Sequence, residues 1–316
     1  MSRWGGMAQG GLCALLISTA WAQTEERTGF SGSAQLGVGY DTNANASTAD
    51  QNFLGFILDP RFQKSESPFG ELALELDHTA ILRPDFGFNS SLQAAHRANP
   101  DAPFADQTVG SMATEAVYLH ADDRYTAGVS AYTDRLDHHD FEQGSNIELG
   151  VSHGTAPHLD TAFSLRASRI GYSSSDYAAM DVDRYLVGLT LTREALGARQ
   201  GSVALTGVAG RDIARQEGSP FGNTRAGLQL STTWPVLPRA ALTGEVSALR
   251  SRYKGLFFDL SRRDEQYEGV LTLEFTDWPA SGWHVAPQLH YVRNDSTVAL
   301  YGYDRTEVAL YVRRQF

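Results

Sequence analysis

The sequence predicts an all-β protein, a transmembrane antiparallel β-barrel of the bacterial outer membrane with about 14 strands. Three patterns support this prediction. Segments of roughly ten residues alternate apolar with polar side chains, as strands with two different faces do. The polar faces are rich in charge, which the core of a soluble β-sandwich would not tolerate unpaired. The connections between the segments are alternately short and long, which is typical of outer-membrane barrels.

The first predicted element is a secretory signal peptide at residues 1–22. Arg3 is its only charged residue, an apolar stretch follows, and Ala20-Trp21-Ala22 provides a cleavage site of small residues. The apolar stretch is too short to span a bilayer as a helix. The only cysteine, Cys13, lies in this segment. Residues 23–316, the predicted barrel domain, therefore offer neither a disulfide nor a thiolate metal site.

The predicted strands each place their main apolar set on one face. In the segment 184–192, for example, Tyr185, Val187, Leu189 and Leu191 share a face. An even number of strands returns the chain to the side on which it started, so we expect both termini in the periplasm. The other segments are 35–40, 71–77, 86–97, 109–120, 124–131, 146–152, 161–168, 202–209, 225–231, 241–248, 266–275, 285–291 and the terminal strand. Within 109–120 the sequence leaves open which face points outward.

The faces opposite these apolar sets carry carboxylates and guanidinium groups. An Arg or Lys that faces hydrocarbon near the bilayer midplane costs about 2–4 kcal/mol, whereas charges of both signs can pair across a wet interior. We therefore expect these side chains to line the lumen. The predicted lumen residues are Glu71, Glu75, Asp77, Arg124, Glu148, Arg166, Arg184, Arg225, Glu245, Glu268, Glu274 and Arg313.

Turn-forming residues predict short periplasmic connections near 83–85, 121–123, 154–157, 234–235 and 277–279. Longer polar segments predict extracellular loops at 41–68, 99–106, 134–145, 171–181, 211–220, 251–262 and 294–303. Aromatic residues near the strand ends suit the girdles that lie at the two membrane interfaces: Tyr40, Tyr125, Tyr185, Trp234, Trp278 and Trp283.

The first long loop contains an apolar patch in an otherwise polar segment. It includes Phe53, Leu54, Phe56 and Ile57. Three interpretations are open: the patch folds into the lumen as a plug, it contacts a partner, or it extends a hairpin beyond the membrane.

Motifs for catalysis or metal binding are weak. The D-x-N-x-N pattern at 41–45 matches the first ligands of an EF-hand loop, but Ala46 and Asn52 replace the Gly and Glu that such a loop requires. Two histidines between aspartates at 137–140 could supply metal ligands or an acid–base pair, but neighbouring residues on a strand point apart. We expect a turn at the first and a solvated loop at the second. The sequence predicts no catalytic site, no metal site, no cofactor and no enzymatic activity.

The last predicted strand runs to the final residue. Leu310, Val312 and Phe316 lie on one face, with the aromatic residue at the terminus. This ending resembles the closing strand of bacterial outer-membrane barrels, where it is the recognition signal for the insertion machinery. The resemblance implies that the chain is exported, inserted by that machinery and surrounded by outer-membrane lipids.

Both ends of the predicted barrel also resemble one family. The segments L-G-V-G-Y-D-T-N-A-N-A (36–46) and W-H-V-A-P-Q-L-H-Y-V-R-N-D-S-T-V-A-L-Y-G-Y-D-R-T-E-V-A-L-Y-V-R-R-Q-F (283–316) are similar to the first strand and last hairpin of the C-terminal barrel of surface lipoprotein assembly modifier (Slam) proteins. The resemblance implies fourteen strands and a role in moving a client lipoprotein to the cell surface. Slam proteins carry a tetratricopeptide domain before the barrel, and no helical repeat of about 34 residues is visible here. A separate periplasmic repeat protein would have to supply that domain.

Composition narrows the functions further. The formal net charge is −11, which disfavours nucleic acid because its phosphates bind clustered Lys and Arg. Three functions remain: a Slam-like barrel that assists translocation or surface display of a lipoprotein, a passive porin-like channel for small solutes, and a structural or adhesive barrel that acts through its extracellular loops. The terminal motifs favour the first of these.

Overall fold

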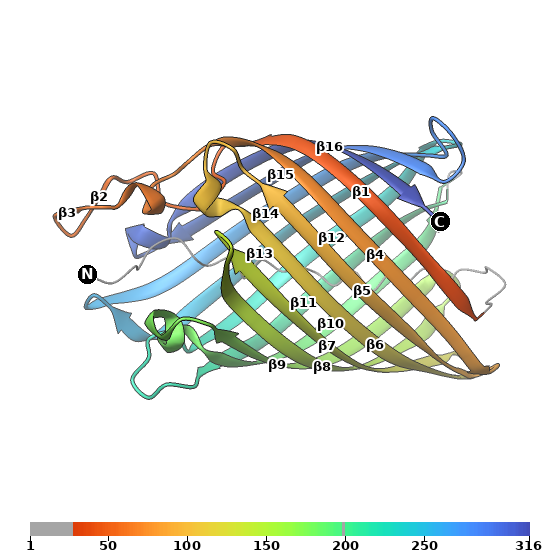
Figure 1. The fold of residues 1–316 in the computed structure, drawn as a ribbon. Helices are drawn as coiled ribbons and strands as arrows, with labels where there is room; N and C mark the ends of the chain where they lie inside the picture. Colours follow the sequence, from red (N-terminus) through yellow and green to blue (C-terminus); the bar gives the residue numbers. More distant parts are fainter. Residues whose placement is uncertain (1–27, 198–199) are drawn as a thin grey trace.

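The structure, a computed structural model, describes residues 28–197 and 200–316, which form a closed antiparallel barrel of fourteen strands (Figure 1). Strands of the wall that follow one another in the sequence pair with each other. The first, β1 (Gly29–Asp41), pairs with the last, β16 (Tyr303–Gln315), and this pairing closes the barrel. The predicted fold class and strand number are confirmed. The predicted signal peptide, residues 1–22, lies outside the described residues.

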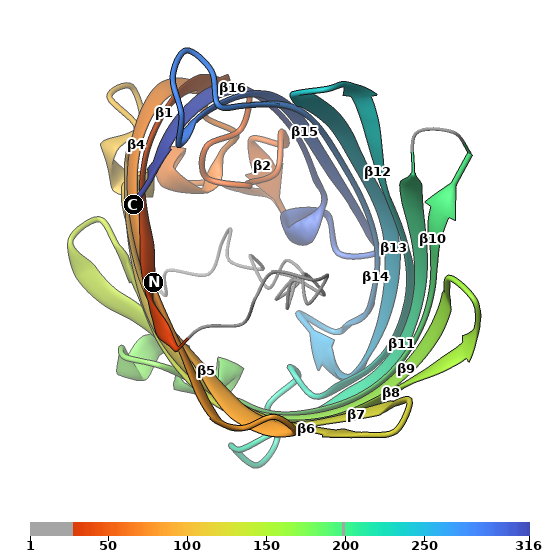
Figure 2. The same cartoon turned by 90° about the vertical axis from the view of Figure 1, so that its right-hand side faces the viewer.

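The other strands of the wall are β4 (Ser67–Arg83), β5 (Phe86–Ala98), β6 (Gln107–His120), β7 (Asp123–Leu136), β8 (His139–Ala156), β9 (Leu159–Tyr172), β10 (Val182–Leu196), β11 (Gly201–Ala214), β12 (Asn223–Leu237), β13 (Ala240–Phe257), β14 (Leu260–Thr276) and β15 (Trp283–Ser296). A separate two-stranded hairpin, β2 (Asn52–Phe53) and β3 (Phe56–Ile57), lies in the connection between β1 and β4. Seen along the axis, this connection lies within the outline of the wall (Figure 2).

Alternation along each strand separates an apolar outer face from a polar inner face. Large apolar side chains such as Leu189 and Leu228 are exposed on the outside of the wall. In β6, whose faces the sequence left open, Met112 is 60% exposed and Val117 is 2% exposed. Even-numbered residues of β6 therefore face outward. Exposed leucines in a continuous band are what a wall that faces lipid requires.

The two ends of the barrel carry different connections. The end that we call the loop end carries the connections at 42–66, 99–106, 137–138, 173–181, 215–222, 258–259 and 297–302. The opposite turn end carries those at 84–85, 121–122, 157–158, 197–200, 238–239 and 277–282, and the C-terminus lies there (Figure 1). Five of the seven connections at the loop end are long, in agreement with the predicted alternation.

Two of the predicted long loops are wrong. The segments 134–145 and 251–262 belong to strands, and two-residue turns at Asp137-His138 and Phe258-Asp259 join them. All four turn residues have positive φ, between 50° and 64°, which fits the right-handed twist of a tight hairpin. The sequence misled because these strands continue past the apolar band, where both faces can be polar.

The strands are correspondingly longer than the membrane requires. They contain between 13 and 18 residues, whereas about 9–11 tilted residues cross the hydrocarbon. A smaller correction concerns the turn end: Trp234 and Pro235 lie within β12, and the turn follows at 238–239, where the β12–β13 register shifts between Pro235 and Leu237. The turn predicted at 154–157 lies at 157–158. Pro235 has no backbone N–H to donate, so it lies at an irregular strand end near the turn and not in the turn itself.

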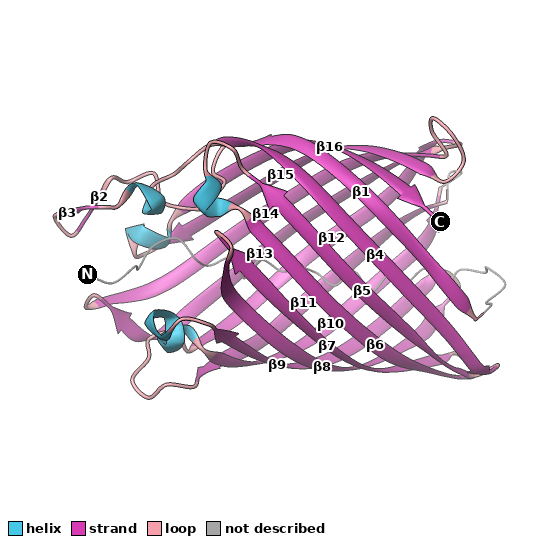
Figure 3. Cartoon of the chain, in the orientation of Figure 1, coloured by secondary structure: helices cyan, strands magenta, loops and turns pink. Residues whose placement is uncertain are grey.

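Four short 3-10 helices occupy the long connections at the loop end (Figure 3). They are η1 (Pro60–Phe62), η2 (Pro103–Ala105), η3 (Ser175–Met180) and η4 (Ala299–Tyr301). None of the described helices is long and apolar enough to cross a membrane.

The C-terminal residue is built into the seam between β1 and β16. The backbone of Phe316 donates to the oxygen of Gly32 at 3.0 Å and accepts from its nitrogen at 2.9 Å. A Cβ atom at Gly32 would lie 2.6 Å from the Phe316 ring, so the glycine makes room for that ring. Leu310 and Val312 share the outer face with Phe316, whose side chain is 73% exposed.

We expect Phe316→Asp to reduce the amount of assembled barrel in the membrane, because it removes the predicted insertion signal. The measurement is the heat-modifiable band in outer-membrane fractions. Phe30→Asp is the matched control, since Phe30 is 74% exposed at the turn end of β1. Equal assembly of the two variants would show that Phe316 contributes only as a surface aromatic residue.

Candidate functional site

A cavity of about 720 Å³ lies inside the barrel. Inward-facing residues of the strands from β5 to β15 line it, together with Met180 of η3 and Phe221 of the β11–β12 connection. Its lining carries charges of both signs. The cavity is the candidate site because it combines internal space with polar side chains that converge from different strands.

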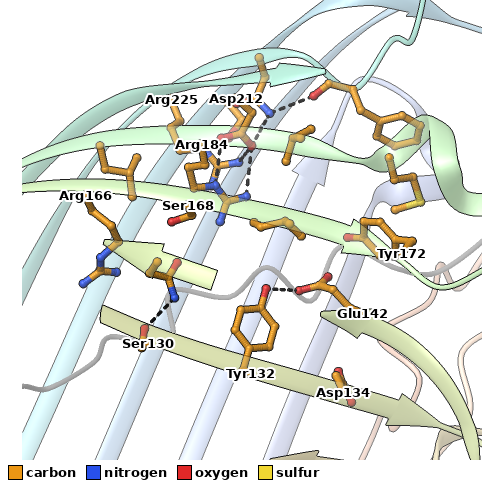
Figure 4. Close-up of a pocket in the computed structure, with 18 of the residues that line it drawn as sticks. Ser130, Tyr132, Asp134, Glu142, Arg166, Ser168, Tyr172, Arg184, Asp212 and Arg225 are labelled. Atoms are coloured by element: carbon orange, nitrogen blue, oxygen red, sulfur yellow. Dashed lines mark hydrogen bonds and ion pairs between the residues drawn. The ribbon is translucent and has the colours of Figure 1, made fainter. Parts of the chain in front are cut away.

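One side of the cavity is organised by a buried carboxylate, Asp212 of β11 (Figure 4). Arg184 of β10 binds both of its oxygens, with Nε at 2.9 Å and Nη2 at 3.1 Å. Arg225 of β12 donates to Oδ2, and the Asn223 amide donates to the same oxygen at 3.0 Å. Two guanidinium groups and one carboxylate leave this side with excess positive charge. Arg166 of β9 adds a further guanidinium, which is paired with Glu148 at 2.7 Å.

The side formed by β7 and β8 is acidic and phenolic. The Tyr132 hydroxyl donates to Glu142 Oε1 at 2.5 Å, and the amide of Gln107 donates to Asp134 Oδ2 at 2.8 Å. The Tyr132 ring lies over the backbone of Gly144, where a Cβ atom would be 2.3 Å from the ring. Figure 4 shows Tyr132, Asp134 and Glu142 on strands separate from those that carry the arginines. A solute in the cavity would therefore meet opposite charges on two sides.

Three polar atoms of the cavity lining are buried without a hydrogen-bond partner among the described residues. They are Asp134 Oδ1, Asn223 Oδ1 and Arg225 Nε. Buried polar atoms without partners are unfavourable unless water or a ligand binds them. Some polar groups of the cavity lining are therefore not fully satisfied by the part of the protein that the structure describes.

Toward the loop end, an apolar cluster packs around Arg262. The Arg262 guanidinium, on a side chain that is 1% exposed, pairs with Asp264 at 2.6 Å and lies 3.3 Å from the centre of the Tyr301 ring. Burial raises the pKa of Tyr301 to about 12, so the phenol stays neutral against the cation. Phe257 packs edge-on against Tyr301 at 5.5 Å and against Phe221 at 5.0 Å.

Of the predicted plug residues, only Phe53 reaches this cluster. Its ring lies 5.1 Å from that of Phe258, and it packs against the cluster together with Leu58. Leu54, Phe56 and Ile57 are 57%, 68% and 83% exposed at the tip of the β2–β3 hairpin. The hairpin therefore projects beyond the mouth and does not fill the lumen (Figure 1).

The remaining predicted lumen residues lie on inner faces of their strands, most of them in pairs. Arg124 lies 3.7 Å from Glu115, Glu268 is 2.8 Å from His290, and Arg313 is 2.6 Å from Glu274. Glu75 accepts from Gln93 at 2.8 Å. The others on inner faces are Glu71, Asp77 and Glu245. Only Arg166, Arg184 and Arg225 of the predicted set line the large cavity.

Sequence reasoning missed several cavity residues, chiefly Asp212, Asp134 and Glu142. All three fell in segments that were predicted as loops because their surroundings are polar. A signal was present in the alternation of Val208, Gly210 and Asp212, since these residues stand at every second position and continue the inner face of β11.

The D-x-N-x-N segment forms a turn at the end of β1. The side chain of Asp41 is fully buried and pairs with Arg97 at 2.7 Å and with Arg305 at 2.6 Å. Both arginines also pair with Glu307, at 2.7 Å and 2.9 Å. This four-residue network joins β1, β5 and β16 across the closing seam, and we call it the seam network. Asn43 continues the turn by donating to the Ser47 carbonyl at 2.9 Å.

Comparisons with known proteins identify only the fold. No protein-family model and no curated protein sequence matches the chain. The outer membrane channel DcaP of Acinetobacter baumannii is similar in structure, with a TM-score of 0.53 and 12% identity over 92% of this chain and 97% of that chain. A loop L8 deletion mutant of OmpT, an outer membrane protein of Vibrio cholerae, has a TM-score of 0.50 and 9% identity over 92% of this chain and 99% of that chain. The chain thus has the fold of outer-membrane β-barrels, and no match supports the Slam family that its ends resemble.

Proposed function

We propose that the protein is a passive, porin-like channel for small solutes in the bacterial outer membrane. The observation that carries the proposal is the internal cavity of about 720 Å³ between a basic and an acidic side. A barrel with a purely structural role has no need of such a cavity. Charged and polar side chains that line an internal path can replace water around a solute.

The proposed orientation rests on the connections. Outer-membrane barrels have short periplasmic turns and longer extracellular loops, so we place the loop end outside the cell and the C-terminus in the periplasm. The Arg262 cluster then lies at the outer mouth, and the charged cavity lies below it. The fold neighbour DcaP is described as an outer membrane channel, which agrees with this proposal.

Single-channel recording in planar bilayers tests the proposal. We expect discrete and stable conductance steps from the purified barrel in KCl, because an open internal path conducts ions. A folded barrel with a heat-modifiable gel band but no conductance would contradict it. The gel control separates a closed channel from a protein that has not folded.

The terminal motifs support a second proposal, a Slam-like role in surface display of a lipoprotein with a periplasmic repeat protein acting as a separate partner. The exposed apolar tip formed by Leu54, Phe56 and Ile57 is a surface that a client could contact. Deletion of the gene should then protect a surface lipoprotein from added protease. Unchanged accessibility of every surface lipoprotein would eliminate this role and leave the channel. Neither proposal assigns an enzymatic activity, a metal or a cofactor.

A further inference from the structure

The outer wall carries a groove that a channel does not need. It crosses β8 to β12 and has a volume of about 580 Å³. The strand register explains the hollow. Leu149, Leu165 and Val187 lie side by side in one row of outward residues, which continues to the small Ala209. In the adjacent row Ala167 lies beside Tyr185, so small side chains interrupt a wall of large ones.

The loop end of this groove is bordered by cations. Arg211 lines the groove directly. Its row continues through Thr224 to Arg252 and Arg263, because residue 211 pairs with 224, 224 with 252, and 252 with 263. Lys254 follows on the same face of β13. All four cationic side chains are exposed on the outside of the wall.

Most of these cations lack a carboxylate. Among the residues that the structure describes, Arg211, Arg252 and Lys254 form no ion pair. Glu265 is shared between Arg263 and Arg250, at 3.6 Å from each. A local excess of positive charge on the lipid-facing wall is notable in a chain with 37 Asp and Glu against 26 Lys and Arg. Cations at the membrane interface without protein partners are best stabilised by anionic groups of the lipid.

We infer that this groove binds a phosphorylated glycolipid of the outer leaflet, of the lipid A type. Its phosphates would be bound by Arg211 and Arg252, and one acyl chain would lie along Ala167 and Ala209. Guanidinium groups form paired hydrogen bonds with phosphate oxygens. An acyl chain would fill the hollow that the small side chains leave. It would make van der Waals contacts there that the wall alone cannot make. The glycolipid is chosen over a phospholipid because the arginines stand at the loop end, which rests on the proposed orientation.

The test uses the folded, delipidated barrel in detergent and diphosphoryl lipid A, with bound lipid counted by native mass spectrometry. We expect the wild-type barrel to bind one lipid A. The double variant that combines Arg211→Ala and Arg252→Ala should bind it at least about tenfold more weakly, a loss of about 1.4 kcal/mol. Arg193→Ala is the control, because it removes a guanidinium group from an exposed side chain of β10 near the turn end, away from the groove. It should leave lipid A binding unchanged.

A second variant tests the groove independently of charge. Ala209→Trp fills the hollow and should also weaken lipid A binding, while the heat-modifiable gel band verifies that the barrel is folded. Equal lipid A binding by wild type and the double arginine variant would overturn the inference. Equal binding of phosphatidylglycerol and lipid A by the wild type would overturn the choice of glycolipid. Channel conductance in bilayers lacking lipid A is expected to be the same in all variants, so the outcome is separate from that of the proposed channel.

Discussion

Replacing Asp41 with Ala is expected to destabilise the barrel by about 3–5 kcal/mol, the range for removing one partner of a buried ion pair. Asp41 is fully buried in the seam network, where it binds Arg97 and Arg305. Without it, two guanidinium groups in the interior share only Glu307. The free energy of unfolding is measured by urea titration of the barrel in lipid vesicles. The heat-modifiable gel band gives the folded fraction at each urea concentration.

Asp85→Ala is the control for this prediction. Asp85 lies 3.6 Å from Arg83 at the turn end, and both side chains are largely exposed. An exposed pair of this kind contributes about 0–1 kcal/mol. If both variants lowered the free energy of unfolding by the same small amount, the seam network would have no special role in closing the barrel.

Replacing Arg225 with Ala is expected to make the proposed channel more selective for cations. Asp212 keeps its two contacts with Arg184 and the amide of Asn223, so the carboxylate stays paired while the cavity loses one positive charge. A unit charge about 4 Å from a passing ion is worth about 1 kcal/mol in water, which corresponds to roughly a fivefold change in relative permeability. The reversal potential in a KCl gradient measures the change from chloride toward potassium.

Arg193→Ala again serves as the control, since Arg193 lies outside the cavity near the turn end and donates to the Pro157 carbonyl. Arg225→Lys should restore the wild-type reversal potential, because it returns the charge. A reversal potential that is the same for Arg225→Ala and wild type would show that ions do not pass this side of the cavity.

The sequence predicted the barrel well because its outer surface obeys one simple rule. Each strand needs apolar residues at every second position where it meets lipid, and Leu72, Val187 and Leu310 are readable on that basis alone. The hairpins at the loop end do not show this apolar alternation. Toward the loop end β7 and β13 continue past the apolar band, and residues such as Asp134 and Arg252 look like those of a loop.

The candidate site was only partly predictable for a different reason. Period-2 alternation identifies Arg166, Arg184 and Arg225 as inward residues, but it carries no information on which strands face each other across the interior. The cavity depends on such long-range positions, and so does the cluster that Phe53 joins from the first loop. The seam network is the extreme case, since Asp41 and Arg305 are 264 positions apart.

That separation also bears on how the barrel is assembled. The seam network joins the first strand of the wall to the last, so its ion pairs cannot form until the remaining wall is in place and the large loop between them has closed. Interactions that form last act mainly on the rate of unfolding, because they are broken early when the native state opens. We therefore expect the seam network to slow unfolding of the inserted protein. Weakening it would shorten the lifetime of the folded barrel more than it would slow insertion.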